Sequence, residues 1–374
     1  MSRPVSTANG SRAELVLLNP GPANTSERVR RAAGRGDMCH REPEFAQLLT
    51  SVRTGLVEAL VAPGSHEAVV ISGSGTAAVE MSLLAAVRPG RSVLVLDNGS
   101  YGARMRQMCS AAGMGVHEVV EEWNRPVDPA RVAEKLAAHP DIDAVAGVMH
   151  ETTSGLVNPM REIGAVVAPT DAVLVVDAIS ATAHEEPELS EIQADLICGT
   201  ANKGLHGLPG ASFVLLGREK GIPRIEQTPA RSVYFDLASH LRAQRAGEVL
   251  YTPAVQIYQS LDEAIKEFQE RGGYPARVAD YRARAALLRT GIERLGLEIL
   301  VAEPHRSNSV TAVRLPAGVT YDRLHDELKR RGFVIYAAQG RLSADYFRIC
   351  NMGELSLRTL ARFVDELEEV LSLW

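Results

Sequence analysis

The sequence predicts an α/β fold with a mostly parallel β-sheet, followed by a smaller α+β part. Three observations lead to this fold class. Apolar residues make up 45% of the 374 residues but aromatic residues only 5%, so the core must consist mainly of aliphatic side chains. Short apolar runs of strand length alternate with helical segments, which is typical of a parallel sheet covered on both faces. After about residue 265 this alternation gives way to a long charged segment and further strands and helices.

The first part of the chain predicts an arm and a helix. Residues 1–13 are polar, and we expect a loosely held N-terminal arm that ends at residue 24. Inside this arm the apolar run LVLLNPGP (15–22) is stopped by its prolines and glycine. Residues 44–62 then carry apolar side chains at helical spacing, and Pro63-Gly64 ends that helix.

The next part predicts a large domain over residues 25–265. Its apolar runs are short and continuous, and helices of crossover length separate them. The predicted strands cover residues 68–72, 92–97, 144–150, 172–178, 196–200 and 212–216. The predicted helices between them cover residues 76–87, 101–112, 129–138 and 160–168.

The last part predicts a smaller α+β domain over residues 266–374. An Ala- and Arg-rich stretch, residues 257–295, indicates one long helix that leads into it. Beyond that helix the expected order is strand, strand, helix, strand, strand, helix. These elements cover residues 297–301, 309–315, 321–331, 333–337 and 347–351 and a final helix from residue 354.

Composition argues against several classes of function. The formal net charge is −6 and no long basic run occurs, so we expect no nucleic-acid partner. No apolar run approaches the ~20 residues that a membrane helix needs, and the N-terminus lacks the apolar stretch of a signal peptide. We therefore expect a cytoplasmic protein with no membrane partner. The four cysteines form no CxxC pair, which indicates buried free thiols and no metal site.

The segment Ser72-Gly73-Ser74-Gly75-Thr76 is a candidate phosphate site. It follows an apolar strand and precedes a helical run, whose N-terminus offers free N–H groups and the positive end of the helix dipole. The glycines allow an anion to approach the backbone, and the hydroxyls add donors. The segment lacks the GxxxxGKS/T and GxGxxG patterns of nucleotide-binding loops. The same residues also fit a tight turn that caps a helix.

Asp177 and Lys203 each lie just past an apolar strand. Asp177 ends the run AVLVVD, at the strand end where ligands bind in open α/β sheets, although it also suits an N-cap. Lys203 lies among the small and hydroxyl residues of GTANKGLHG (199–207). Pyridoxal 5′-phosphate (PLP) needs a lysine amine, a carboxylate at its ring nitrogen and a phosphate anchor. These residues therefore predict PLP as cofactor, with Lys203 and Asp177 as catalytic residues and Lys203 as the group that moves the proton.

Beyond these residues, the chain resembles the class V, fold-type I PLP aminotransferases over nearly its whole length. HETTSGLVNP (150–159) and ANKGLHGLPG (201–210) are the most specific segments, and they favour the branch of 2-aminoethylphosphonate:pyruvate transaminases over the serine:pyruvate and alanine:glyoxylate enzymes. The resemblance implies a large domain with a mostly parallel seven-stranded-type sheet and a smaller C-terminal α+β domain. The other matching segments are LLNPGPANTS (17–26), DMCHREPEF (37–45), SGSGTAAVE (72–80), DNGSYGARM (97–105), VDAIS (176–180), YTPAVQ (251–256) and FRICNMG (347–353).

The resemblance also implies which residues bind the cofactor. Lys203 would carry PLP and Asp177 would pair with its ring nitrogen. Tyr101 would stack on the ring, and Thr153 would contact the region of the ring hydroxyl. The phosphate would be held by Ser74, Gly75, Thr76 and, less directly, Thr200.

Other roles implied by the resemblance concern the substrate and a second subunit. Tyr251 and Thr252 would reach the phosphate from a neighbouring subunit, so the active site would form only in a homodimer. Arg348 would bind the acid group of the substrate, because a guanidinium fork suits a carboxylate or a phosphonate. Further substrate-binding residues would be Asn19, Gly21 and Arg41. The chain departs from the family at Tyr101, where several relatives carry Trp, and at Cys350, where Gly is more usual.

The implied activity is transfer of the amino group of 2-aminoethylphosphonate to pyruvate, giving phosphonoacetaldehyde and L-alanine. The alternatives are a serine or alanine:glyoxylate-type transaminase, or a transaminase for another small aminophosphonate. A desulfurase of the same fold would need a mobile cysteine in a long loop, which none of the four cysteines is predicted to occupy. A catalytically silent protein is disfavoured by Lys203 and Asp177, and a nucleotide-binding protein by the missing dinucleotide turn.

Overall fold

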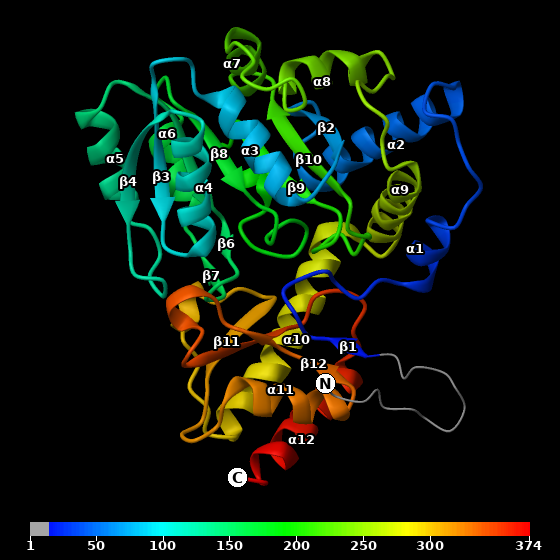
Figure 1. The fold of residues 1–374 in the computed structure, drawn as a ribbon, viewed down its shortest axis with the longest axis vertical. Helices are drawn as coiled ribbons and strands as arrows, with labels where there is room; N and C mark the ends of the chain where they lie inside the picture. Colours follow the sequence, from blue (N-terminus) through cyan, green and yellow to red (C-terminus); the bar gives the residue numbers. More distant parts are fainter. Residues whose placement is uncertain (1–14) are drawn as a thin grey trace.

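The computed structural model describes residues 15–374, so the predicted arm is described only from residue 15 onward and its first fourteen residues lie outside the described part. A seven-stranded sheet forms the centre, in the order β2-β10-β9-β8-β5-β3-β4 (Figure 1). β10 is antiparallel to both of its neighbours and the other pairs are parallel, which confirms the mostly parallel sheet. The strands are β2 His66–Ser72, β3 Ser92–Asp97, β4 Gly115–Val120, β5 Ile142–Val148, β8 Val173–Asp177, β9 Leu196–Thr200 and β10 Ala211–Gly217.

Both faces of this sheet are buried under helices. Successive side chains point to opposite faces, so Val93 and Val95 of β3 enter one core while Leu94 and Leu96 enter the other. Burying each such side chain contributes roughly 1.5–3 kcal/mol. One face is covered by α2 Pro43–Leu60, α5 Pro129–Ala138, α6 Met160–Val167 and α9 Val255–Glu270. The other is covered by α3 Gly75–Ala86, α4 Ser100–Ala111, α7 Gly221–Gln227 and α8 Leu237–Arg245.

A smaller α+β part lies beside the carboxyl ends of the parallel strands (Figure 1). Its three-stranded sheet has the order β11-β14-β13, and β1 pairs in parallel with β12, which brings the start of the described chain into the same core. Its elements are α10 Gly273–Arg294, β11 Val310–Arg314, α11 Tyr321–Arg330, β12 Phe333–Val334, β13 Tyr336–Ala337, β14 Tyr346–Cys350 and α12 Leu357–Leu371, joined by β1 Val16–Leu17. The remaining elements are α1 Glu27–Ala32, β6 His150–Glu151, β7 Leu156–Val157 and the 3₁₀ turns Leu189–Glu191, Glu303–His305 and Gly340–Leu342.

The structure corrects the prediction of a single long helix. Residues 257–295 form parts of two helices, α9 and α10, because Gly272 and Gly273 adopt φ of +94° and +62° between them. This left-handed region is open to glycine and strained for other residues, so the chain turns there. The expected domain boundary at residue 265 falls inside α9, and the division into domains stays a prediction.

Two further expectations are corrected, and one strand was missed. The predicted strand over residues 297–301 forms only an isolated bridge between Ile299 and Val313. Strand β4 was missed because GVHEVV lies at the sheet edge and is mostly half-buried, so it lacks a continuous apolar run. Cys39 is exposed, so the expectation of buried thiols was wrong for it, whereas the other three cysteines are buried.

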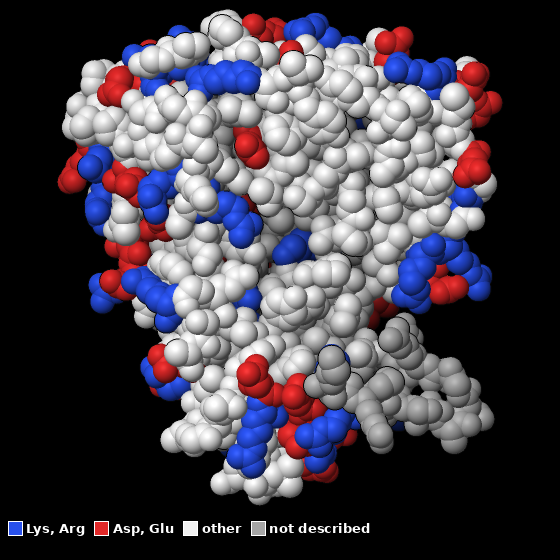
Figure 2. All heavy atoms as spheres, in the orientation of Figure 1, with Lys and Arg blue, Asp and Glu red and all other residues white. Residues whose placement is uncertain are grey.

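The surface of the face shown in Figure 2 mixes acidic and basic side chains around its rim. No basic stripe crosses this face, and its centre is largely uncharged (Figure 2). Within residues 15–374, no helix combines the length and the apolar character that crossing a bilayer requires.

Candidate active site

A cleft of about 170 Å³ lies where β5, β8 and β9 end and where α3 and α4 begin. These strands are parallel, so their carboxyl ends meet at one edge of the sheet, and the start of each helix faces the same edge. Segments that are up to about 130 residues apart in the chain therefore share one wall. The predicted site residues that line this cleft are Ser74, Gly75, Thr76, Tyr101, Asp177, Thr200 and Lys203.

Lys203 is the buried amine of the cleft. It follows β9, and its Nζ donates to the carbonyl oxygen of Pro20. Burial lowers the pKa of Lys203 from 10.5 to about 8, although Cys350 and Asp177 oppose the shift. An amine with a pKa near 8 is substantially unprotonated in mildly alkaline solution, so it can act as a nucleophile and as a base.

Gly21 lies directly against Lys203. A Cβ atom at Gly21 would come within 2.7 Å of Cδ and Cε of Lys203 and within 2.9 Å of its Nζ. Gly21 also adopts a φ of +112°, which disfavours other residues. The structure thus places Gly21 against the lysine side chain, whereas its predicted contact with substrate stays a prediction.

Asp177 is a buried carboxylate at the end of β8. Its Oδ1 accepts from the backbone N–H of Ile179 at 2.9 Å, so it caps a turn and not a helix. Burial raises the pKa of Asp177 from 3.8 to about 7, and nearby Glu151 adds to this shift while Lys203 opposes it. A carboxylate that is this strongly desolvated favours a cationic partner in the cleft.

The start of α3, where the sequence predicts a phosphate site, forms one wall of the cleft. Ser74 is the N-cap residue, and its side chain makes no capping hydrogen bond, so the hydroxyl is available to a ligand. Gly75 packs against Ile179, where a Cβ atom would approach the Ile179 side chain to 2.5 Å. The helix N-terminus therefore lies next to the turn that carries Asp177, and its first residues line the same cleft.

Glu151 is a functional candidate that was not predicted from the sequence. Its carboxylate is fully buried and accepts from the N–H of Tyr101 at 3.1 Å and from the N–H and hydroxyl of Thr153 at 3.0 and 2.5 Å. Burial raises the pKa of Glu151. Thr153 does not line the cleft, and its hydroxyl also accepts from the N–H of Ser100. Glu151 thus fixes the start of α4, including Tyr101, against the HETTSG segment.

Arg348 is completely buried on β14, outside the lining of the cleft. Its guanidinium donates to the carbonyl oxygens of Thr152 at 2.9 Å and of Ala337 at 3.0 and 2.8 Å. These contacts tie the smaller sheet to the HETTSG segment. Cys350 pairs with Val310 of β11, so the strand stays regular at this departure from the family. The substrate contact of Arg348 stays a prediction.

The remaining predicted residues lie away from the cleft lining of their own chain. Asn19 is buried, and its Oδ1 has no hydrogen-bond partner within residues 15–374. Arg41 donates to the carbonyl oxygen of Val249 at 3.4 Å. The hydroxyl of Tyr251 donates to a backbone carbonyl at 2.7 Å, and its ring stacks on Tyr234, while Thr252 is exposed. A role for Tyr251 and Thr252 in a neighbouring subunit's site stays a prediction.

Two titratable residues that were not predicted, His150 and Arg104, also line the cleft. His150 donates from Nδ1 to the carbonyl oxygen of Ser180 at 2.8 Å, and its buried Nε2 has no partner among the described residues. Burial lowers the pKa of His150 to about 4, so it is a neutral acceptor at pH 7. Arg104 lies with its guanidinium carbon 4.9 Å from the ring centre of Tyr101, one helical turn away. The i, i+3 spacing of Tyr101 and Arg104 was the signal available in the sequence.

Comparison with known proteins gives one consistent result. The family described as aminotransferase class-V matches residues 23–363. A 2-aminoethylphosphonate–pyruvate transaminase of Syntrophobacter fumaroxidans is 33% identical over 95% of this chain and 96% of its own length. A protein of the same name from Aeromonas hydrophila is 33% identical over 92% of this chain and 91% of its length. The solved structure of an alanine–glyoxylate aminotransferase from Nostoc sp. superimposes with a TM-score of 0.90 at 23% identity, covering 99% of this chain and 97% of that one.

Proposed function

The chain belongs to the class-V aminotransferases, and on this premise we propose that it transfers the amino group of 2-aminoethylphosphonate to pyruvate, giving phosphonoacetaldehyde and L-alanine. As a member of this family it is a PLP-dependent enzyme. The observation that carries the substrate assignment is the full-length similarity to transaminases of that name. The alternative, a serine or alanine:glyoxylate-type activity, has only the fold of the Nostoc enzyme in its favour.

The residues of the cleft fit PLP. Lys203 offers a buried amine, Asp177 a desolvated carboxylate that favours a cation, and Ser74 a hydroxyl that does not cap its own helix. We propose that Lys203 carries the cofactor, Asp177 faces its ring nitrogen, and Ser74, Gly75, Thr76 and Thr200 hold its phosphate. When bound, PLP supplies an electron-accepting ring that makes a proton next to the substrate amine removable.

In this proposal the protein supplies proton transfer and charge. The Nζ of Lys203 would take the proton from the amine-bearing carbon of the substrate and deliver it to C4′ of the cofactor, since an amine with a pKa near 8 both accepts and donates near neutral pH. The carboxylate of Asp177 stabilises positive charge on its neighbour, and that pairing lowers its own pKa. Tyr101 covers one side of the cleft and excludes water. The unpartnered Nε2 of His150 would accept a hydrogen bond from a ligand bound in the cleft.

The acid groups of both substrates require cations. We propose that Arg348 binds the carboxylate of pyruvate or the phosphonate of the donor, with Arg104 as a second cation. Arg104 lines the cleft, and its positive charge acts on Asp177 there. A phosphonate carries more charge than a carboxylate near neutral pH, so a second guanidinium favours it by direct attraction.

Absorbance of the purified, PLP-loaded protein tests the proposed function. Addition of 2-aminoethylphosphonate should remove the visible band of the bound cofactor, and pyruvate should restore it. A band that ignores this donor but responds to serine or alanine would favour the alternative substrates. A protein that never develops a visible band with PLP would contradict the cofactor.

Replacing Glu151 with glutamine is expected to reduce kcat/KM by roughly 10–100-fold, the loss of about 1–3 kcal/mol when a buried hydrogen bond is left unmade. Glutamine keeps the shape but turns one accepting oxygen into an NH₂ group that faces an N–H or a hydroxyl. We expect Tyr101 to shift, so the absorbance maximum of the bound cofactor should move as well.

Glu185→Gln is the matched control for Glu151→Gln. Glu185 is equally buried, lies outside the cleft lining, and has its pKa raised by burial to about 8, so it is protonated at pH 7 and glutamine imitates it. Equal losses of activity in the two variants, or an unchanged cofactor spectrum in Glu151→Gln, would argue against a positioning role.

We also propose that the enzyme is a homodimer in which Tyr251 and Thr252 reach the phosphate site of the neighbouring subunit. A heterodimer tests this arrangement. Chains with Lys203→Ala and chains with Tyr251→Ala and Thr252→Ala should each form inactive homodimers. The purified heterodimer should recover roughly half of the parent activity, since one of its two sites holds only native residues. If both residues serve their own chain, the heterodimer will stay inactive.

A further inference from the structure

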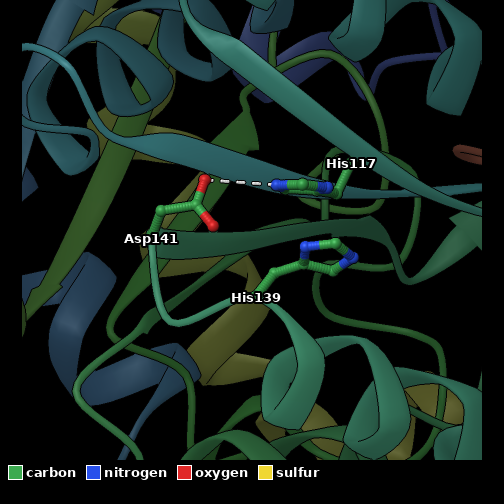
Figure 3. Close-up of side chains that lie close together, drawn as sticks. All are labelled: His117, His139 and Asp141. Atoms are coloured by element: carbon green, nitrogen blue, oxygen red, sulfur yellow. Dashed lines mark hydrogen bonds and ion pairs between the residues drawn. The ribbon is translucent and has the colours of Figure 1, made fainter.

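His117, His139 and Asp141 meet at the edge of the central sheet, away from the cleft (Figure 3). His117 belongs to the edge strand β4, His139 ends α5, and Asp141 lies in the loop that enters β5. All three side chains are partly exposed, so the cluster is open to solvent. None of them takes part in the proposed reaction.

The cluster brings three potential metal ligands close together. His117 Nε2 lies 3.2 Å from Asp141 Oδ2, and the two imidazole rings stack with their centres 3.9 Å apart. One potential ligand atom from each residue lies within 4.8 Å of the other two. Ligands at 2.0–2.2 Å from a tetrahedral ion are separated by about 3.3–3.6 Å, so the His117–Asp141 distance is close to one edge of such a site. Figure 3 shows the His117 ring above that of His139, with the carboxylate beside them.

We propose that His117, His139 and Asp141 bind one divalent ion of the zinc class, with solvent completing its coordination. Two imidazoles and one carboxylate suit zinc, cobalt and nickel better than magnesium or calcium, which prefer oxygen ligands alone. The ion joins β4 to the connection between α5 and β5, so it stabilises the outermost strand of the sheet.

Contacts around the cluster prepare it for an ion. The hydroxyl of Ser92 donates to Asp141 Oδ2, which orients the carboxylate toward the two imidazoles. The N–H of Ser92 donates to the carbonyl oxygen of Asp141 at 3.0 Å, which fixes the loop to β3. The ring of His139 makes no hydrogen bond within residues 15–374, so it is free to ligate.

A simple histidine–aspartate hydrogen bond is the competing explanation, and the chain contains a matched example. His325 Nδ1 lies 3.0 Å from Asp326 Oδ1 on α11, and no second imidazole completes that pair. His325→Gln is therefore the control for His139→Gln. His139→Gln is the informative variant, because it removes a ligand without breaking a hydrogen bond of the fold.

Calorimetry tests the site. The untagged, PLP-loaded protein is treated with a chelator and then titrated with ZnCl₂. A Cys39→Ser background removes the one exposed thiol among the described residues. We expect one ion per chain, binding more than about tenfold weaker in His139→Gln, and unchanged binding in His325→Gln. Zn²⁺ should raise the unfolding temperature of the parent but not of His139→Gln.

A second probe separates a failed site from a failed fold. Co²⁺ bound through two imidazoles should give visible d–d bands that disappear in His139→Gln and in His117→Gln, while the cofactor band shows that both variants are folded. Equal zinc affinity in the parent and in His139→Gln, or no binding by the parent at millimolar Zn²⁺, would overturn the proposal. Neither result depends on transaminase activity.

Discussion

Replacing Lys203 with alanine is expected to abolish transamination, lowering kcat by more than about 10³-fold, since the loss combines the cofactor's anchor with the proton carrier. Among the described residues, Lys203 is the only lysine that lines the cleft, so no second lysine amine can replace it. Alanine formation from pyruvate, measured with excess PLP, reports the loss. The visible band of the bound cofactor should also shift, since its amine partner is gone.

Lys220→Ala is the matched control. Lys220 is also partly buried, burial also lowers its pKa, and its Nζ donates to the carbonyl oxygen of Thr170 outside the cleft. We expect this variant to keep its kcat and lose at most stability. Retention of parent-like kcat by Lys203→Ala would refute the assigned role.

Replacing Asp177 with asparagine is expected to lower kcat by roughly 10²–10³-fold, because a neutral amide cannot hold positive charge on the cofactor ring. Asparagine keeps the volume and the acceptor for the N–H of Ile179, so the turn after β8 should survive. Rates of alanine formation at saturating substrates measure the effect. An unchanged kcat would contradict a catalytic role for this carboxylate.

The same substitution, Asp177→Asn, should stabilise the cofactor-free protein in alkaline solution, although it lowers kcat. The pKa of Asp177 is about 7 in the fold and about 3.9 in the unfolded chain, so the folded state binds its proton more tightly. The stability that the protonated carboxyl of Asp177 contributes is fully present below about pH 4. Up to about 4 kcal/mol of it is lost as the pH rises through 7. Asp177→Asn should therefore be more stable than the parent at pH 8 when PLP is removed, and similar at pH 4. Thermal unfolding at the two pH values checks this, and bound PLP should erase the difference.

Much of the central sheet could be predicted from sequence. Strands β3 and β9 match their predicted ranges because both are buried on each face, which makes them continuous apolar runs. Strand β4 was missed for the opposite reason, since an edge strand needs fewer apolar residues. The prediction of a single long helix was wrong. The composition of the segment favours helix throughout, and the two glycines that turn the chain were too few to outweigh it.

The sequence by itself determined the residues at strand ends. Asp177, Lys203 and the Ser74–Thr76 segment each follow an apolar run, so their place at the carboxyl edge of a parallel sheet follows from local pattern and strand direction. Only the tertiary structure decided the contacts between distant segments. Arg348 reaches Thr152 across 196 residues, Lys203 reaches Pro20 across 183, and Glu151 holds Tyr101 across 50. No local pattern encodes these pairs, because they depend on how the smaller sheet and the first residues of the chain pack against the large sheet.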